Sequence, residues 1–143
     1  MTKGSYILLM KMPEGETVKV GSLAETHFPA GCYAYVGSAM DGFTSRVRRH
    51  RKKDKKPRWH IDYLTERASI SDIILCQTEE RLECAIAQAL SRQFSSIPSF
   101  GSSDCSCPSH LFLTANENQM KASVLAILKS LPVDKRIRRH LPK

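Results

Sequence analysis

Residues 32–53 constrain the fold most strongly, because they place a strand, a glycine-marked turn and a helix in direct succession. In residues 32–38 the side chains alternate, so Tyr35 and Gly37 share one face of the predicted strand. The helix predicted for residues 43–53 runs back along this strand. Side chains on its inner face are therefore expected to lie beside Tyr35 and Gly37.

The predicted helix combines an apolar stripe with basic side chains. Asp41 is a candidate N-cap, and Phe43 and Val47 define the stripe at helical spacing. His50 falls beside the stripe, and Arg46 lies on its flank. The helix is thus expected to direct an imidazole and a guanidinium towards the strand, a combination suited to chemistry on a phosphate group.

The whole chain predicts an α/β fold of the α+β kind, in which helices flank a small, mainly antiparallel sheet. Apolar runs bounded by turn residues predict strands at 4–11, within 17–28, at 71–77 and at 111–113. Further helices are predicted at 57–67, from Thr78 onwards, and from an Asn116 cap paired with Gln119 to Pro132. Residues 95–109 are predicted to form a loop.

The length of 143 residues fits a single domain, expected at residues 1–131 and followed by a basic C-terminal tail at 132–143. There is no apolar run of the ~18 residues that a membrane helix needs, and no export signal. We therefore expect a cytoplasmic protein without a membrane or an obligate protein partner. An odd count of 5 cysteines argues against a disulfide framework, and Cys32, Cys76 and Cys84 are expected to be buried thiols.

The formal net charge of +8 is concentrated in residues 46–58 and 135–140. Such patches attract polyanions by releasing counterions, so nucleic acid is the expected partner. Glycine at the end of the predicted strand also allows a close approach to the backbone. The expected nucleic-acid-binding residues are Gly37, Ser38, Arg48, Arg49, Lys52, Lys53 and Lys55. The alternative is that these charges belong to a solvated helix face and a disordered tail.

Two short motifs carry a family resemblance. Gly4-Ser5-Tyr6 begins the first predicted strand, and Tyr35-Val36-Gly37 ends a later strand, ahead of Arg46 and His50. This order resembles the GIY-YIG endonucleases, in which a Gly-x-Tyr strand and a Tyr-x-Gly strand precede an Arg-x-x-x-His helix. Serine replaces the usual isoleucine of the first motif, and residues 12–31 separate the motifs more widely than is usual in that family.

The resemblance extends from Gly4 to Leu113 and points to the small, stand-alone Uri-type branch of these proteins. The later segments that carry it are Trp59–Leu64, Glu83-Cys84, and Phe100–Cys107 with His110.

The resemblance implies an endonuclease that hydrolyses phosphodiester bonds in nucleic acid, with Mg²⁺ or Mn²⁺ as cofactor. DNA is favoured over RNA, and both stay open as substrates. It implies that Tyr6 and Tyr35 orient or deprotonate a water molecule, and that Arg46 binds the scissile phosphate. It also implies that His50 assists proton transfer and that Glu83 holds the metal ion. One carboxylate is enough for magnesium, because this ion keeps several of its waters.

Helical spacing adds one residue to the expected catalytic group. His60 and Asp62 lie on nearly opposite sides of the second predicted helix, so only one of them can face a small cleft. His60 shares its side with Tyr63 and Leu64. We therefore assign His60 to the cleft and expect Asp62 to hold a neighbouring basic residue.

The loop before the last strand permits two interpretations. In the first, Ser103, Asp104 and His110 line the cleft and close it over a phosphate. In the second, Cys105, Cys107 and His110 supply three ligands to zinc, and His60, Asp104 or another residue supplies the fourth. We predict no stoichiometric zinc, because Cys-x-Cys is a cramped start for a tetrahedral site and no second cysteine pair exists.

Each catalytic assignment has a structural alternative. Strand tyrosines are often core residues with one bonded hydroxyl, and Glu83 is placed to interact with a helix dipole. The chain could therefore be a non-catalytic nucleic-acid-binding or zinc-binding module on the same fold. The enzyme is expected to cleave nucleic acid only with a divalent metal, whereas the module would leave it intact.

Overall fold

The computed structural model describes residues 3–21, 23, 25–40, 42–52, 56, 59–102 and 105–139. Its strands are β1 (Gly4–Met12), β2 (Glu16–Lys19), β3 (Glu25–Phe28), β4 (Gly31–Ala39), β5 (Ser69–Gln77), β6 (Ser95–Ser96), β7 (Leu111–Thr114) and β8 (Arg136–Arg139). Its helices are α1 (Phe43–Arg51), α2 (His60–Thr65), α3 (Glu83–Ser91) and α4 (Glu117–Ser130). The predicted α+β class is confirmed.

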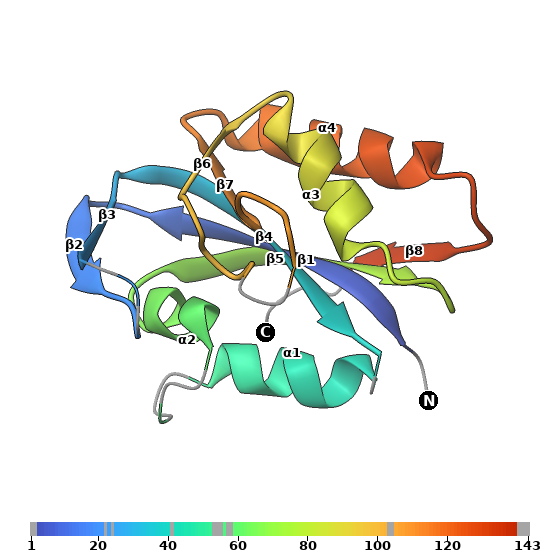
Figure 1. Ribbon diagram of the computed structural model, residues 1–143, viewed down its shortest axis with the longest axis horizontal. Coiled ribbons are helices and arrows are strands. Elements are labelled where there is room, and N and C mark those ends of the chain that lie inside the picture. The colour runs from blue at the N-terminus through green and yellow to red at the C-terminus, as the bar shows by residue number, and fades with distance from the viewer. Residues whose placement is uncertain are drawn as a thin grey trace.

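β1 lies near the centre of a 6-stranded antiparallel sheet with the order β6-β7-β4-β1-β5-β8 (Figure 1). β2 and β3 form a separate hairpin. The register of β1 and β4 places Tyr6 opposite Gly37 and Leu8 opposite Tyr35. The long separation between the two motifs is thus taken up by the hairpin, and it leaves Tyr6 and Tyr35 on neighbouring strands.

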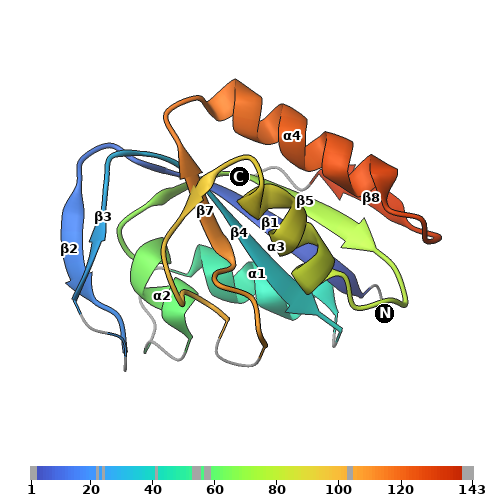
Figure 2. The same cartoon turned by 45° about the horizontal axis from the view of Figure 1, so that its top comes forward.

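Helices cover both faces of the sheet, with α1 and α2 on one side and α3 and α4 on the other (Figures 1 and 2). Alternation along β1 turns Tyr6 and Leu8 towards α1, α2 and the hairpin, whereas Ile7 and Leu9 face α3 and α4. Burying one large apolar side chain stabilises the fold by roughly 1.5–3 kcal/mol. The two apolar layers therefore fix the direction in which each β1 side chain points.

α3 begins at Glu83, later than the predicted start at Thr78. The Thr78 hydroxyl accepts a hydrogen bond from the Glu80 N–H at 3.2 Å and so holds a turn ahead of the helix. This late start makes Glu83 the first helical residue. At α4, the Asn116 side chain accepts a hydrogen bond from the Gln119 N–H at 3.0 Å, which confirms the predicted cap.

Other elements differ from prediction mainly at their ends. α1 ends at Arg51 instead of residue 53, α2 is shorter than the predicted 57–67, and β5 begins at Ser69. Asp41, the predicted cap of α1, lies outside the described residues. None of the helices that the structure describes is long and apolar enough to cross a membrane.

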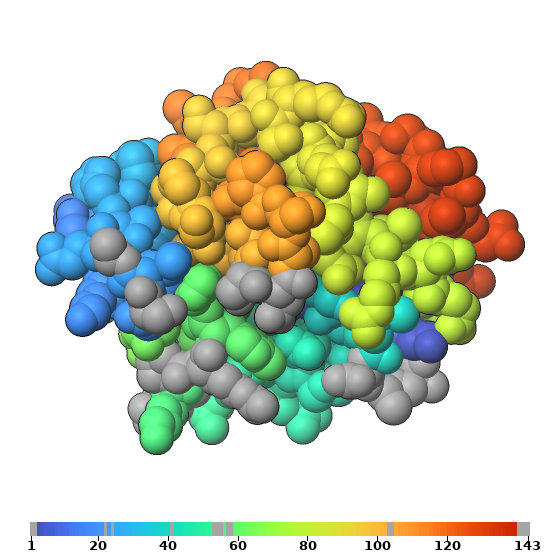
Figure 3. Space-filling view, in the orientation of Figure 1, coloured from blue at the N-terminus to red at the C-terminus, as the bar shows by residue number. Residues whose placement is uncertain are grey.

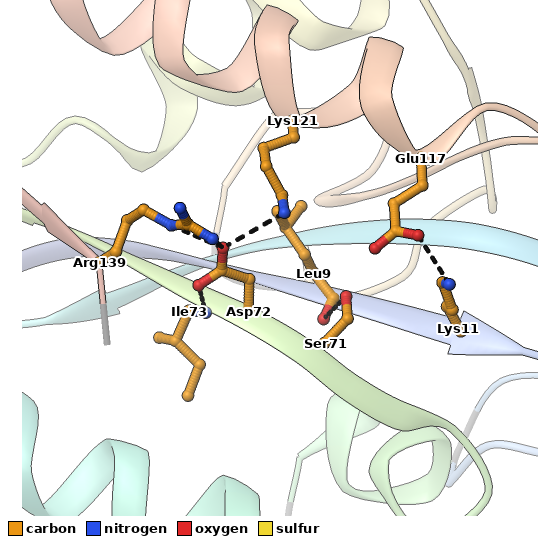
Figure 4. Close-up of polar contacts among 8 residues, drawn as sticks. All are labelled: Leu9, Lys11, Ser71, Asp72, Ile73, Glu117, Lys121 and Arg139. Carbon is orange, nitrogen blue, oxygen red and sulfur yellow. Dashed lines mark hydrogen bonds and ion pairs between the residues drawn. The ribbon is translucent and has the colours of Figure 1, made fainter. Parts of the chain in front are cut away.

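The predicted basic tail is in part a strand of the sheet, because residues 136–139 form β8 beside β5. Arg139 donates from Nε to Oδ2 of Asp72 at 2.8 Å, and Lys121 Nζ lies 3.6 Å from the same oxygen (Figure 4). Asp72 is fully buried, so its carboxylate depends on such partners. The folded domain therefore continues beyond residue 131, where it was expected to end.

Replacing Arg139 with alanine is expected to lower the free energy of unfolding by roughly 1–3 kcal/mol, because a buried carboxylate loses its best partner. Arg136→Ala is the matched control, since Arg136 lies on the same strand with an exposed side chain. Urea denaturation measures both variants. Equal losses of stability would contradict a specific role for the Arg139–Asp72 pair.

Candidate functional site

A cavity of about 700 Å³ lies beside the start of β1 and the end of β4. It is lined from α1 and α3 as well as from the sheet, and by the segments that precede α2 and β7. We refer to this cavity as the cleft. The predicted site residues that line it are Tyr6, Tyr35, Gly37, Ser38, Arg46, His60, Glu83 and His110.

A phenol and an imidazole form a buried pair at the base of the cleft. The Tyr6 hydroxyl oxygen and Nε2 of His50 are joined by a hydrogen bond of 2.6 Å. His50 is a fully buried residue of α1, and its ring centroid lies 6.3 Å from that of Tyr35. The structure thus brings both motif tyrosines and His50 together. A hydroxyl bonded to an imidazole can pass a proton from the cleft into the protein.

Tyr6 leaves no room for a side chain at position 37, so this position requires glycine. These residues face each other across β1 and β4, and a Cβ atom on Gly37 would overlap the Tyr6 ring. Glycine therefore makes room for the phenol. Gly37 was predicted to approach nucleic acid, and the side-chain space that it leaves open is filled by Tyr6. Ser38, which follows it, is half-buried at the cleft wall.

Arg46 is held over an aromatic ring. Its guanidinium carbon lies 4.5 Å from the centroid of the Trp59 ring, and it also interacts with the Tyr6 hydroxyl. Stacking on an indole limits the rotamers of an arginine while leaving its N–H groups able to bind an anion. Trp59 was not among the predicted site residues. It is the N-cap residue of α2.

Arg49 has a structural partner, although it was predicted to bind nucleic acid. Its Nη2 donates to Oδ2 of Asp62 at 2.6 Å, and its guanidinium lies over the Trp59 ring. Asp62 is fully buried and also accepts a hydrogen bond from the Trp59 N–H at 2.9 Å. The prediction that Asp62 holds a basic residue is confirmed.

The other residues of the α1 region that were predicted to bind nucleic acid divide into two groups. Arg48 and Lys52 are exposed, as expected for residues that point away from the core. Lys53 and Lys55 lie outside the described residues.

Burial keeps both tyrosines of the cleft in the phenol form. It raises the pKa of Tyr6 well above its usual value of 10.0, an effect that nearby Tyr35 increases and Arg46 opposes. Burial also raises the pKa of Tyr35, and the nearby Glu83 carboxylate adds to this increase. At physiological pH both hydroxyls are therefore neutral and can orient a water molecule through their oxygen atoms.

Glu83 brings a carboxylate to the cleft from the first turn of α3. Its Oε2 is buried and has no hydrogen-bond partner among the residues described. A buried carboxylate oxygen without a partner is costly, and a bound cation would satisfy it. Glu83 is thus a fitting ligand for a hard divalent ion, which prefers oxygen.

His60 faces the cleft, as predicted, but one of its nitrogens is engaged. The Gly101 N–H donates to Nδ1 of His60 at 2.9 Å. Gly101 has φ 69, and a Cβ there would approach the Tyr35 ring to 2.9 Å. His60 therefore positions the loop next to Tyr35. The predicted lining residues Ser103 and Asp104 lie outside the described residues.

Three thiols and an imidazole meet at one edge of the cleft. The ligand atoms of Cys84, Cys105, Cys107 and His110 all lie within 4.8 Å of one another. Figure 3 shows the loop before β7 lying against the segment that contains the start of α3. We call these four residues the Cys3His cluster; their side chains could hold a metal ion.

The cluster corrects the expectation for Cys84 and bears on the prediction about zinc. Cys84 was expected to be a simple buried thiol, but it is half-buried and belongs to the cluster. The prediction of no stoichiometric zinc rested on the cramped Cys-x-Cys spacing and on the lack of a second cysteine pair, whereas the cluster gains a third thiol from Cys84 of α3. In the metal-free protein, burial and the neighbouring thiols raise the pKa of Cys84 to about 12, so this thiol is protonated.

The profile of one protein family, described as domain of unknown function DUF123, matches residues 5–133. The match includes the whole cleft and the Cys3His cluster. No curated protein and no solved structure gives a match to the chain.

Proposed function

The chain belongs to the DUF123 family, and we propose that it hydrolyses phosphodiester bonds in nucleic acid with the help of a divalent cation. One observation carries the proposal: the cleft collects a phenol–imidazole pair, a stacked arginine and a partnerless carboxylate oxygen from β1, α1 and α3. Metal-assisted phosphodiester hydrolysis needs an activated water, a cation for the developing charge, and a metal ligand. The resemblance to GIY-YIG endonucleases supports the same assignment.

Tyr6 and His50 serve to activate the water. When the imidazole carries its proton on Nδ1, Nε2 accepts the Tyr6 proton, and the phenol oxygen is left to accept a hydrogen bond from water. As the water attacks phosphorus, its proton passes to Tyr6 and the Tyr6 proton passes to His50. This relay needs no phenolate in the resting state, in agreement with the raised pKa of Tyr6.

Arg46 serves to bind the scissile phosphate. Its planar guanidinium matches two phosphate oxygens, and stacking on Trp59 holds it before the substrate arrives. A preorganised cation stabilises the extra negative charge of the pentacoordinate phosphorus without reorganising during the reaction. Tyr35, on the adjacent strand, helps to orient the same water.

Glu83 would hold Mg²⁺ or Mn²⁺ through its buried carboxylate oxygen. When bound, the ion would polarise a phosphate oxygen and stabilise the leaving oxygen. One protein carboxylate suits magnesium, because substrate oxygens and water complete its octahedron.

A basic surface formed by α1 and β8 is suited to the phosphate backbone. A second cavity, of about 350 Å³, is lined by Arg48 and Arg51 of α1 and by Arg138 of β8. The two basic runs of the sequence, distant along the chain, therefore meet on one side of the molecule. Contacts of this kind attract nucleic acid without reading its sequence.

Reversing the charge of Arg48 and Lys52 to glutamate is expected to weaken binding to all sequences alike. A plot of log affinity against log salt has a negative slope, and each lost phosphate contact reduces the magnitude of this slope by about one unit. Fluorescence anisotropy with labelled DNA over a range of salt concentrations measures this slope. Arg92→Glu, a charge reversal at an exposed position after α3, is the control. An unchanged slope in the double variant would mean that this face of α1 is only solvated.

The proposed activity is tested by incubating the purified chain with labelled single-stranded, duplex and branched DNA and with RNA. Each substrate is tested with magnesium, with manganese and with a chelator. We expect cleavage only with a divalent ion, and more of it on DNA. Arg46→Ala protein, purified in parallel, excludes a contaminating nuclease. The proposal fails if no substrate is cut with either ion.

The Cys3His cluster favours a second candidate function, a metal-stabilised module that binds nucleic acid without cleaving it. In this case the cleft would bind phosphate through Arg46 alone. The two candidates differ in one result, because the module would bind labelled DNA tightly and release it intact in the presence of magnesium.

A further inference from the structure

The Cys3His cluster has the ligands and the spacing of a zinc site. Tetrahedral zinc binds sulfur at ~2.3 Å and nitrogen at ~2.0 Å, which places its ligand atoms about 3.5–3.8 Å apart. Sγ of Cys105 and Nε2 of His110 are already 3.4 Å apart, and no pair in the cluster exceeds 4.8 Å. A small contraction of side chains would complete the tetrahedron.

Backbone hydrogen bonds hold His110 in place. The His110 N–H donates to the Phe100 carbonyl at 2.8 Å, and its carbonyl accepts from the Val36 N–H at 2.9 Å. His110 is thus held between its own loop and β4, and its side chain is buried. Cys84, in contrast, projects from the first turn of α3. The cluster therefore joins the start of α3 to the loop before β7, two segments that are distant in sequence and adjacent in the folded protein.

The donor set selects the metal. Three thiolates and an imidazole are soft ligands that suit zinc and do not suit magnesium or calcium. Four protein ligands fill the tetrahedron and leave no open position for water, which is the pattern of structural zinc sites.

We propose that the Cys3His cluster binds one zinc ion in a closed tetrahedral site that fastens the loop before β7 to the start of α3. On binding, the thiols of Cys84, Cys105 and Cys107 each lose one proton to solvent. Two positive charges and three thiolates leave the site with a net charge of −1. The site is structural and is distinct from the cation site at Glu83.

The zinc site also positions cleft residues, a consequence that rests on the proposed function. Glu83 immediately precedes Cys84 in α3, so fixing one fixes the backbone of the other. On the loop side, Gly101 lies against Tyr35 and donates to His60. Zinc would therefore keep Glu83, the metal ligand of the cleft, at a constant distance from the loop at Gly101, which lies against Tyr35.

The test begins with the full chain purified without added metal. We expect elemental analysis to find about one zinc per chain. After replacement by Co²⁺, we expect the intense visible bands and thiolate charge-transfer absorption of a tetrahedral thiolate site. Cys84→Ser is expected to weaken zinc binding at least about 100-fold, because it removes one of four ligands. Cys32→Ser, at a half-buried thiol of β4 outside the cluster, should keep the full zinc content.

If Cys84→Ser does not fold, the absorption spectrum of the Co²⁺-loaded wild-type protein still tests the zinc site. Absence of tetrahedral thiolate bands after Co²⁺ loading, or a zinc affinity unchanged in folded Cys84→Ser, would overturn the zinc site. Neither result depends on nuclease activity. Zinc found in a protein that cuts no nucleic acid would leave the site standing and reject the proposed hydrolase.

Discussion

Arg46→Ala is expected to lower the single-turnover rate of DNA cleavage by about 10²–10³-fold, because it removes a preorganised cation from the transition state. The loss should appear in the rate at saturating DNA more than in affinity, since many other basic residues contribute to binding. Arg46→Lys should recover only part of the rate, because an ammonium group cannot bind two phosphate oxygens in one plane or stack on Trp59 in the same way.

Arg92→Ala is the control for this experiment, because Arg92 is exposed after α3 and does not line the cleft. Circular dichroism and thermal unfolding establish that each variant is folded. A folded Arg46→Ala protein that cuts DNA at the wild-type rate would rule out Arg46 as the phosphate ligand.

Glu83→Gln is expected to reduce metal-dependent turnover at least about 100-fold while DNA affinity remains within a few-fold of wild type. The amide keeps the side-chain shape but removes the anionic oxygen that a hard cation prefers. Isothermal titration of Mn²⁺ into the protein–DNA complex measures the accompanying loss of metal affinity.

Zinc content is the control for this variant, since Glu83 adjoins the Cys3His cluster in α3. The variant should retain as much zinc as the wild type. Unchanged Mn²⁺ affinity in Glu83→Gln would mean that this carboxylate serves only the start of the helix.

Most of the fold was predictable from the sequence, because local patterns determine its main elements. Alternation in β4, the apolar run of β1 and the Asn116 cap of α4 are read directly from neighbouring residues. The start of α3 was predicted too early, since Thr78 has the side chain of a helix cap and uses it to hold a turn. β8 was missed because its charge suggests a tail, and only Asp72 on β5 reveals its partner.

The cleft was predictable where a short motif fixes the geometry. Tyr6, Tyr35, Arg46 and His50 lie on two paired strands and the helix that follows, so their meeting depends on few contacts. The roles of Arg49 and Cys84 depend on contacts with other segments of the chain, at Asp62 and in the loop before β7. The residue spacing within a single segment does not predict such contacts. The usable signal for Cys84 was a further cysteine beside an acidic residue, in a chain that already carries a Cys-x-Cys and a nearby histidine.

The most direct test of the cleft is anomalous diffraction from crystals of the protein with Mn²⁺ and a phosphorothioate oligonucleotide that resists cleavage. We predict one manganese peak at the Glu83 carboxylate, with the phosphate between this ion and Arg46 and the water position facing the Tyr6 hydroxyl. A phosphate bound away from Arg46, or manganese absent from Glu83 while the oligonucleotide occupies the cleft, would contradict the proposed hydrolase.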